Sequence, residues 1–357
     1  MIKKKRILTL IISLIILLVF FSGCNENPSN KSRALYVDSD NIDGPWDGTQ
    51  QHPYKYIQNA INNSSANETI FVLSGFYYEY LFIDKPINLV GSGAVNTFIY
   101  PNDVKSNNDS TIFISADNCT IKDFDISFDG IISVNIGIRI GSSNNTILNN
   151  TFSNFKYGVY FFSDSSDYII YGNNISYNSI SDCSYGIYTN SDMSHNMFFN
   201  NSIEYNQYGF EFYSAVNNNI IANEVSYNSM YGIYLSSGSD GNIISYNYLK
   251  GNYYGIRFKG VSYNEIFANK VVENDIGFYS CCGSNHNILY YNSLINNNKQ
   301  ASDAFSNSWD NGEFGNYWDD YSQKYPNATH LDGIWDTAYD ILEGYNKDNF
   351  PLVTPFV

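Results

Sequence analysis

The chain has 357 residues, of which 43% are hydrophobic and only 15% are charged, and its formal net charge is −16. This hydrophobic content is enough to build a core in a chain of such length, which excludes a disordered protein. The negative charge argues against nucleic acid and anionic lipid as partners of the folded surface, because both repel an acidic protein.

The N-terminus has the pattern of a secretory signal. Four basic residues at positions 3–6 precede an apolar run, Ile7 to Phe21, and the small residues Ser22 and Gly23. This run is shorter than the roughly 20 residues that a membrane-spanning helix needs, although an uncleaved anchor remains an alternative. Phe-Ser-Gly-Cys resembles the lipobox of lipoproteins, with Phe21 in place of the usual aliphatic residue, and implies lipidation of Cys24. Both interpretations place residues 34–357 outside the cytoplasm, tethered to a membrane.

Removal of residues 1–23 takes away four basic groups and changes the formal charge from −16 to −20. A surface of this charge also repels polyanionic polysaccharides unless a cation bridges the two. The four cysteines after Cys24 are too few for a disulfide framework. The adjacent pair Cys281 and Cys282 could form a soft-metal site, but two small buried residues, or one disulfide partner and a spare, is the preferred interpretation.

An internal repeat determines the expected fold. The motif Asn-x-apolar-x-x-Asn recurs from residue 145 to residue 292, and its closing asparagines are 22–28 residues apart. A weaker copy, YIIYGN, is aligned at 168–173. A second column, an aromatic residue or Ile followed by Gly and an apolar residue, keeps the same spacing from IGI (136–138) to IGF (276–278). In both columns the spacing between repeats is longer at one place, which predicts one inserted loop between residues 171 and 200.

The repeats favour short strands over helices. The segments alternate with a period of two, are rich in Ile, Tyr and Phe, and are interrupted by Asn, Ser and Gly. About three such strands per repeat can form one coil that pairs with the next at ~4.8 Å. Asparagine suits the corners because it tolerates the left-handed conformation, and stacked amides can bond to one another. The sequence therefore predicts an all-β, right-handed parallel β-helix of about ten coils.

With these repeats, the chain resembles the pectate-lyase class of right-handed β-helices and, more closely, the NosD-like group of secreted proteins. The segments 35–61 and 68–93 resemble the entry module of that group: a short helix, a strand ending in Gly75, and a Lys-Pro-Ile-x-Leu-x-Gly strand from Lys85 to Gly91. The tail resembles its terminal segment. This resemblance implies the fold and not the chemistry, because the class contains lyases, hydrolases, epimerases and adhesins. It also implies an association with the maturation of copper enzymes.

The patterns divide the chain into five segments. We expect a signal peptide at 1–23, a polar linker at 24–33, an N-terminal cap with the first coils at 34–135, regular repeats at 136–298 and a C-terminal capping segment at 299–357. In this last segment Trp318 and Trp335 lie among five aspartates. We interpret it as a plug for the open end of the coil. A calcium loop is the alternative, although the Asp-x-Asp-x-Asp-Gly run that such a loop prefers is absent.

The second column predicts one candidate binding surface. The residue after each glycine is apolar and should point inward, so the next residue should point outward. These outward residues, the outer column, are Arg139, Tyr160, Tyr188, Glu211, Tyr234, Arg257 and Tyr279. Aromatic rings beside charged groups suit the faces and hydroxyls of sugar rings. The alternative is that tyrosine occupies these positions only because it is a good strand residue.

Two other clusters are weaker candidates for chemistry. In the segment 122–129 the residues Asp123, Asp125 and Asp129 should share one strand face, at a spacing that suits a pair of catalytic carboxylates or a calcium ion. A solvated strand face is the alternative. Met193, His195 and Met197 have an i, i+2, i+4 spacing that could bind copper(I) on one strand face.

We expect a non-catalytic cell-surface protein that binds a glycan along the outer column or has a structural role. A polysaccharide lyase or glycoside hydrolase and a NosD-like copper accessory protein are the alternatives. No cofactor is expected under the first hypothesis. Calcium would be a cofactor of the lyase alternative, and copper would be the ion of the accessory-protein alternative.

Overall fold

The structure, a computed structural model, describes residues 33–101, 110–128, 136–165 and 167–356. Residues from Ala34 to Val357 form one compact unit. The predicted signal peptide, the lipidation of Cys24 and the candidate Asp129 lie outside the described residues. Within the ranges described, no helix is long and apolar enough to cross a membrane.

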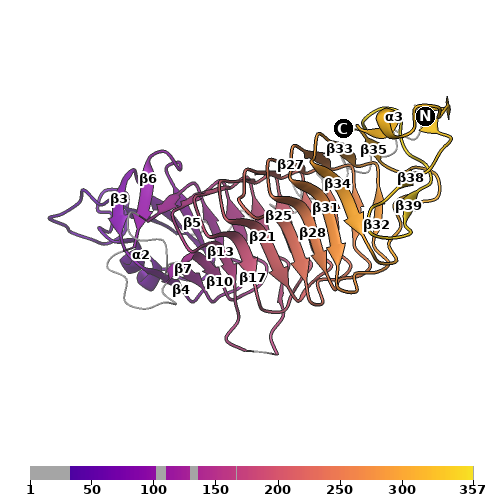
Figure 1. Cartoon of the computed structure of the whole chain (residues 1–357). Helices are drawn as coiled ribbons and strands as arrows, with labels where there is room; N and C mark the ends of the chain where they lie inside the picture. Colours follow the sequence, from indigo (N-terminus) through magenta and orange to yellow (C-terminus); the bar gives the residue numbers. More distant parts are fainter. Residues whose placement is uncertain (1–32, 102–109, 129–135, 166, 357) are drawn as a thin grey trace. The chain divides into compact units, whose positions relative to one another are not determined.

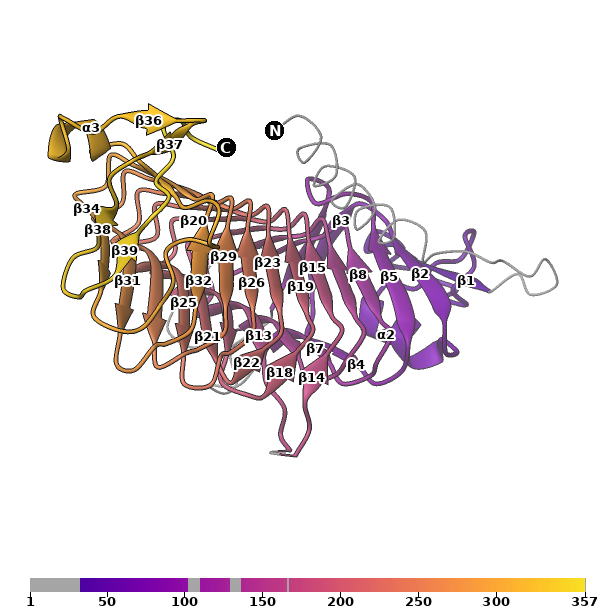
Figure 2. The same ribbon diagram turned by 90° about the vertical axis from the view of Figure 1, so that its right-hand side faces the viewer.

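The described chain winds into a right-handed parallel β-helix, as the repeat predicts. Between residues 68 and 303 each coil contributes one strand to each of three sheets, A, B and C, and each of these strands pairs in parallel with the strand of the neighbouring coil. Figure 1 shows sheet C and Figure 2 shows sheet A, in which strands distant in sequence lie side by side. About ten coils stack in this way.

The strand bounds follow the coils along the stack. Sheet A contains β1 (Ala34–Val37), β2 (Glu68–Val72), β5 (Ile87–Gly91), β8 (Thr120–Lys122), β11 (Thr146–Leu148), β15 (Asn174–Ser176), β19 (Met197–Phe199), β23 (Asn219–Ile221), β26 (Ile243–Ser245), β29 (Glu265–Phe267) and β32 (Ile288–Tyr290). Sheet B contains β3 (Gly75–Tyr78), β6 (Thr97–Tyr100), β9 (Asp125–Ser127), β12 (Thr151–Ser153), β16 (Ser179–Ser181), β20 (Ser202–Glu204), β24 (Glu224–Ser226), β27 (Tyr248–Lys250), β30 (Lys270–Val272), β33 (Ser293–Ile295) and β35 (Tyr317–Trp318). Sheet C contains β4 (Leu81–Ile83), β7 (Ser110–Ile114), β10 (Ile136–Ile140), β13 (Tyr157–Phe161), β17 (Tyr185–Thr189), β21 (Tyr208–Tyr213), β25 (Tyr231–Ser236), β28 (Tyr254–Lys259), β31 (Ile276–Cys281) and β34 (Lys299–Asp303).

Three coils have a short extra strand, and the first of these coils also contains the inserted loop. The extra strands are β14 (Ile170–Tyr171), β18 (Met193–Ser194) and β22 (Ala215–Val216). The loop joins β13 to β14 and projects from the stack (Figure 2). It lies before residue 171, so its predicted position between residues 171 and 200 was wrong. The cause was the alignment of YIIYGN, because the amide that follows Asn150 in the stack is Asn178 and not Asn173.

Inward side chains fill the coil with apolar contacts. The residues after each glycine of sheet C, such as Ile138, Phe210 and Ile256, are buried as the alternation predicts. The glycines themselves are required by the close approach of neighbouring coils. A Cβ atom on Gly209 would lie 2.5 Å from the carbonyl oxygen of Gly232. Small residues at this column therefore let sheet C stack without a gap.

Left-handed residues turn the chain at the corners. They include several residues other than glycine, such as Asn200 (φ 52°), Tyr227 (φ 55°) and Glu273 (φ 55°). Each of these is followed by a buried asparagine that faces the next coil. The corners therefore cost local strain, and the asparagine side chains offset it with hydrogen bonds.

Three asparagine ladders run along the stack. The sequence predicted that asparagine amides stack but did not predict the number of ladders. Their members are Asn145, Asn173, Asn196, Asn218, Asn242, Asn264, Asn287 and Asn307 in the first; Asn150, Asn178, Asn201, Asn223, Asn247, Asn269, Asn292 and Asn316 in the second; and Asn206, Asn228, Asn252, Asn274 and Asn297 in the third.

Asn201 shows the bonding of one member. Its Nδ2 donates to Oδ1 of Asn223 in the next coil (2.9 Å) and to the carbonyl oxygen of Ile175 in the previous coil (2.9 Å). Its own Oδ1 accepts from the backbone N–H and the Nδ2 of Asn178 (3.0 and 3.1 Å). The side chain thus satisfies two backbone groups of the previous coil and the amide oxygen of the next ladder member, so every polar atom of this buried amide has a partner.

A helix covers the N-terminal part of the core. In α2 (Ile57–Asn63) the residues Ile57, Ala60 and Ile61 are buried. Glu79 closes the start of this helix, because its carboxylate accepts from the backbone N–H groups of Ile57 (2.7 Å) and Gln58 (3.0 Å). The carboxylate of Glu79 therefore joins the helix to the first coils by charge-assisted hydrogen bonds.

The tail packs on the last coil. The coil continues past residue 298, where the repeat motif ends, because β34 pairs with β31 and β35 pairs with β33. Beyond them lie α3 (Tyr321–Lys324), β36 (His330–Leu331), β37 (Ile334–Trp335), β38 (Tyr339–Asp340) and β39 (Lys347–Asp348). Trp318 and Tyr339 are buried and stack at 4.1 Å. This aromatic packing is what a cap needs.

Each ladder ends on an acidic residue of the tail. Asn307 donates to Asp303 (3.0 Å), and the backbone N–H of Asn316 donates to Asp348 (2.7 Å). The third ladder reaches Asp319 through Gln300, which accepts from Asn297 (2.8 Å) and donates to the aspartate. Three of the carboxylates between residues 303 and 348 therefore close the ladders.

Candidate functional site

The outer column forms in the predicted register. Arg139, Tyr160, Tyr188, Glu211, Tyr234, Arg257 and Tyr279 are consecutive partners across sheet C. A parallel column of five tyrosines precedes the glycines: Tyr157, Tyr185, Tyr208, Tyr231 and Tyr254. These five residues and the four tyrosines of the outer column are called the tyrosine face.

The outer column is less exposed than the alternation predicts. Tyr234 is only 6% exposed and Glu211 only 7%. The cause is lateral packing: the rings of Tyr231 and Tyr234 lie 4.8 Å apart, and so do those of Tyr157 and Tyr160. Outward direction and exposure are therefore different properties here: Glu211 and Tyr234 have the predicted register but are buried by their neighbours.

Arg257 holds the centre of the tyrosine face together. Its guanidinium lies 5.0–5.6 Å from the rings of Tyr231, Tyr234, Tyr254 and Tyr279. Its Nη1 donates to the hydroxyl of Tyr231 (2.6 Å). A cation among four ring faces stabilises the packing, so part of the role predicted for Arg257 in ligand binding is structural.

Glu211 is a buried acid on the same face. Burial raises its pKa, and the hydrogen bond from the Tyr213 hydroxyl (2.6 Å) and the charge of Arg257 oppose this rise. At the other end of the column, Arg139 packs on the rings of Phe113 and Phe162 and pairs with Asp164 (2.8 Å). The charged members thus have internal partners before any ligand arrives.

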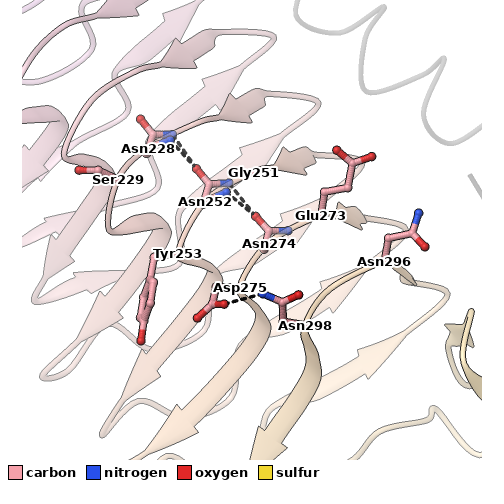
Figure 3. Close-up of a pocket in the computed structure, with 10 residues that line it drawn as sticks. All are labelled: Asn228, Ser229, Gly251, Asn252, Tyr253, Glu273, Asn274, Asp275, Asn296 and Asn298. Atoms are coloured by element: carbon pink, nitrogen blue, oxygen red, sulfur yellow. Dashed lines mark hydrogen bonds between the residues drawn. The ribbon is translucent and has the colours of Figure 1, made fainter.

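A groove follows the corner between sheets B and C, beside the tyrosine face. It has a volume of about 600 Å³ and is lined by Asn228, Ser229, Gly251, Asn252, Tyr253, Glu273, Asn274, Asp275, Asn296 and Asn298 (Figure 3). The third ladder forms its floor, so the groove crosses four coils. Tyr253 is 45% exposed, and its ring meets that of Tyr254 edge-on at 4.8 Å.

The two carboxylates of the groove lie on either side of Asn274 (Figure 3). Glu273 pairs with Lys250 (3.3 Å), and Asp275 accepts from Nδ2 of Asn298 (2.7 Å). Sequence reasoning missed this site because it followed the residues after each glycine. The available signal was the third asparagine column, whose neighbours Tyr253 and Asp275 come one residue after a ladder member.

The aspartate cluster does not share one strand face. Asp123 is a left-handed corner residue (φ 69°) that accepts from Asn149 (2.6 Å), whereas Asp125 begins β9 and accepts from Ser127 (2.7 Å). Partial burial raises the pKa of Asp125. The strand spacing assumed for a carboxylate pair therefore does not apply to Asp123 and Asp125.

The predicted copper ligands point in different directions. Met193 is fully buried in the core on β18, and His195 is an exposed corner residue (φ 54°). Met197 lies on β19, a different strand. The assumption of one strand face was wrong because the chain turns at His195.

Comparisons with known proteins give the family. The family model described as "Periplasmic copper-binding protein (NosD)" matches residues 61–253 and 174–323, which together span more than half of the chain. The chain belongs to the NosD family. A search of curated proteins finds no match.

Solved structures share the fold of this NosD family member. The Dettilon tailspike protein has a TM-score of 0.58 at 15% identity, with 80% of this chain and 60% of that chain covered. The A-module of the Azotobacter vinelandii mannuronan C-5 epimerase AlgE4 has a TM-score of 0.53 at 15% identity, covering 79% and 86%. XylC in complex with xylose has a TM-score of 0.52 at 11% identity, covering 77% and 70%. At such identities the likeness shows the β-helix and nothing about the chemistry.

The family description raises the question of which residues could hold copper. Met193, His195 and Met197 do not fit, because they do not converge. Across the part of the chain that the structure describes, no group of three or more His, Cys, Asp and Glu side chains is placed to hold a metal ion. The soft donors that remain side by side are the thiols of Cys281 and Cys282.

Proposed function

We propose that this NosD family member is an extracytoplasmic protein that binds a neutral glycan in the groove beside the tyrosine face. The observation that carries the proposal is the groove itself: about 600 Å³, polar amides and carboxylates, and one half-exposed tyrosine ring. Sugar sites combine a flat ring with hydrogen-bonding groups in this way. The coil repeat of about 4.8 Å is close to the length of one sugar residue, so four coils offer successive subsites.

Charge restricts the ligand class. Glu273 and Asp275 line the groove, and the formal charge of the whole chain is −16. A polyanionic chain would be repelled. The description of the family as periplasmic supports a location outside the cytoplasm. Two proteins with the same fold are named for carbohydrates, the mannuronan epimerase and XylC, which makes glycans the first ligand class to test.

Replacing Tyr253 with alanine should weaken binding of a neutral oligosaccharide about tenfold, since one stacked ring contributes about 1–1.5 kcal/mol. Binding would be found on an array of neutral glycans and measured by calorimetry. Tyr263→Ala is the matched control, because Tyr263 is 68% exposed at the corner before sheet A, outside the groove. Equal losses in both variants, or no binding to any glycan by the parent protein, would refute the proposal.

A second candidate function is glycan hydrolysis in the same groove. Glu273 and Asp275 are the two carboxylates there, and hydrolases use such a pair as acid and base or nucleophile. If the protein cleaves a neutral polysaccharide, Glu273→Gln and Asp275→Asn should each lower the rate by at least about 100-fold. Reducing-end assays would measure the rate, with Glu224→Gln as a control on sheet B outside the groove. Cleavage that persists in both groove variants would exclude these residues.

A further inference from the structure

The N-terminal end of the stack exposes an apolar surface. The phenylalanine and tryptophan side chains that the described chain exposes most are Trp46, Phe71, Phe76 and Phe82. All four lie in the first coils or in the loop that follows β1. In later coils the most exposed aromatic side chains are tyrosines. This end therefore differs in chemistry from the rest of the surface, and monomeric proteins seldom expose such a group of apolar side chains without a partner.

Three segments come together at this end. The backbone N–H of Gly75, where β3 begins, donates to the corner between β5 and β6 (2.9 Å), and that corner contains Val95. The loop after β1 packs against the same glycine, because a Cβ atom on Gly75 would lie 2.3 Å from Oγ of Ser39. The exposed side chains on these segments, which we call the end patch, are Ile42, Trp46, Leu73, Phe76, Tyr78 and Val95.

Ring stacking holds two members of the end patch in place. Phe76 stacks on Phe98 of the next coil (4.8 Å), and Tyr78 stacks on Tyr100 (5.7 Å). Because β3 is the first strand of sheet B, Phe76 and Tyr78 remain 55% and 60% exposed (Figure 1). Side chains that are already ordered lose little conformational entropy when a partner covers them.

The composition of the end patch favours lipid over sugar as its partner. Four of the six side chains are pure hydrocarbon, and the indole N–H of Trp46 already donates to the carbonyl oxygen of Asn41 (2.8 Å). A sugar site needs several convergent hydrogen-bonding groups, which this surface lacks among its six members. Tryptophan and tyrosine beside aliphatic residues are instead typical of protein surfaces at the membrane–water interface.

The place of the end patch in the chain also favours a membrane. The sequence predicts an anchor at Cys24 or in the apolar run before it, and the fold begins at Ala34. The linker at 24–33 reaches at most about 35 Å when fully extended, and the last coil lies roughly 45 Å farther along the stack. The N-terminal end is therefore the end of the stack that lies nearer to the anchor along the chain.

We propose that the end patch binds the lipid surface of the membrane to which the chain is anchored, which orients the β-helix with its N-terminal end toward the bilayer. The lipid is zwitterionic, because the loop that contains Trp46 also contains Asp40, Asp43 and Asp47, and these disfavour anionic headgroups. An anchor and an apolar surface together hold a protein on a membrane more firmly than either alone. The groove, which is lined by residues 228–298, lies in later coils and points to no lipid contact.

The test measures tryptophan fluorescence of the full-length protein in phosphatidylcholine vesicles whose acyl chains carry bromine, a short-range quencher. Trp46 is the reporter, because Trp309 and Trp318 are buried and Trp335 lies in the C-terminal cap. Brominated lipid should lower the emission of the parent protein relative to unbrominated lipid. The variant Trp46→Phe keeps an apolar side chain and should give equal emission in both kinds of vesicle.

A patch variant and a matched control separate lipid contact from the anchor. Phe76→Ser/Val95→Ser should lose at least about half of the quenching, because its apolar contact with lipid is removed. Tyr263→Ser/Leu331→Ser is the control, since these side chains are 68% and 78% exposed outside the end patch. It should keep the quenching of the parent protein. All replaced residues are exposed, so the melting temperatures should stay unchanged.

Three results would overturn the proposal. The first is an absence of quenching in the parent protein at every protein-to-lipid ratio, which means that another copy or another segment covers the end patch. The second is an equal loss of quenching in the patch variant and the control. The third is stronger quenching when anionic phosphatidylglycerol is added, because charge would then direct the contact. The end patch is independent of the groove, so glycan binding by the patch variant should equal that of the parent protein.

Discussion

Replacing Asn201 with alanine is expected to lower the free energy of unfolding by on the order of 4 kcal/mol. The change removes an amide that is 1% exposed and makes hydrogen bonds to Asn178, Asn223 and Ile175. Several buried donors and acceptors of two neighbouring coils would lose their partners, and each costs about 1–3 kcal/mol. Bonds in one network also strengthen one another, so the loss exceeds that of an isolated pair.

Denaturation in urea, followed by circular dichroism, measures this effect. Asn200→Gly is the matched control, because Asn200 is exposed and left-handed (φ 52°), a conformation that glycine adopts without strain. The control should stay within about 1 kcal/mol of the parent protein. If Asn201→Ala and Asn200→Gly have the same small effect, the ladders do not carry the stability argued for them.

The stability of the C-terminal cap is expected to fall as the pH rises from about 4 to about 7. Asp348 is fully buried, and burial raises its pKa from 3.8 to about 7, although the N–H groups of Asn316, Trp318 and Phe350 favour its charged form. Because the folded pKa lies above the unfolded one, the folded state binds the proton more tightly in this range. The stabilisation is complete below pH 4 and is lost by about pH 7, and it amounts to roughly 4 kcal/mol.

The comparison with Asp348→Asn isolates this group from the other carboxyls. Urea midpoints between pH 4 and 8, read from tryptophan fluorescence, should fall more steeply with pH in the parent protein than in the variant. Trp318 is a suitable reporter, since its Nε1 donates to Asp348 (2.8 Å). Parallel pH profiles for the two proteins would show that Asp348 has an ordinary pKa.

Repetition made most of the fold predictable from the sequence. One coil shows where the sequence pattern fails. Asn173 and Asn178 could each be the closing asparagine of the motif, and only the hydrogen bonds from Asn145 and Asn150 show which ladder each belongs to. The third ladder escaped notice because its members stand beside varied residues. Periodicity identifies a column only when its neighbours are also periodic.

The candidate site was less predictable, because exposure depends on neighbours from several coils. Strand alternation gave the outward direction of Tyr234 correctly, but its burial results from the ring of Tyr231 and the guanidinium of Arg257. The groove arises where a corner recedes between two sheets, and no single segment encodes it. Asp123 was predicted to lie on a strand, but it is a left-handed corner residue.

The ends of the asparagine ladders give the stack an electrical direction. In each ladder the amide Nδ2–H groups point toward the C-terminal coil and the oxygens toward the previous coil, so the amide dipoles add along the axis as peptide dipoles add in a helix. The positive end of this array meets the acceptors Asp303, Asp348 and, through Gln300, Asp319. Whole coils could then be added or deleted without disturbing this polarity, whereas a cap carrying basic residues at these positions would be repelled.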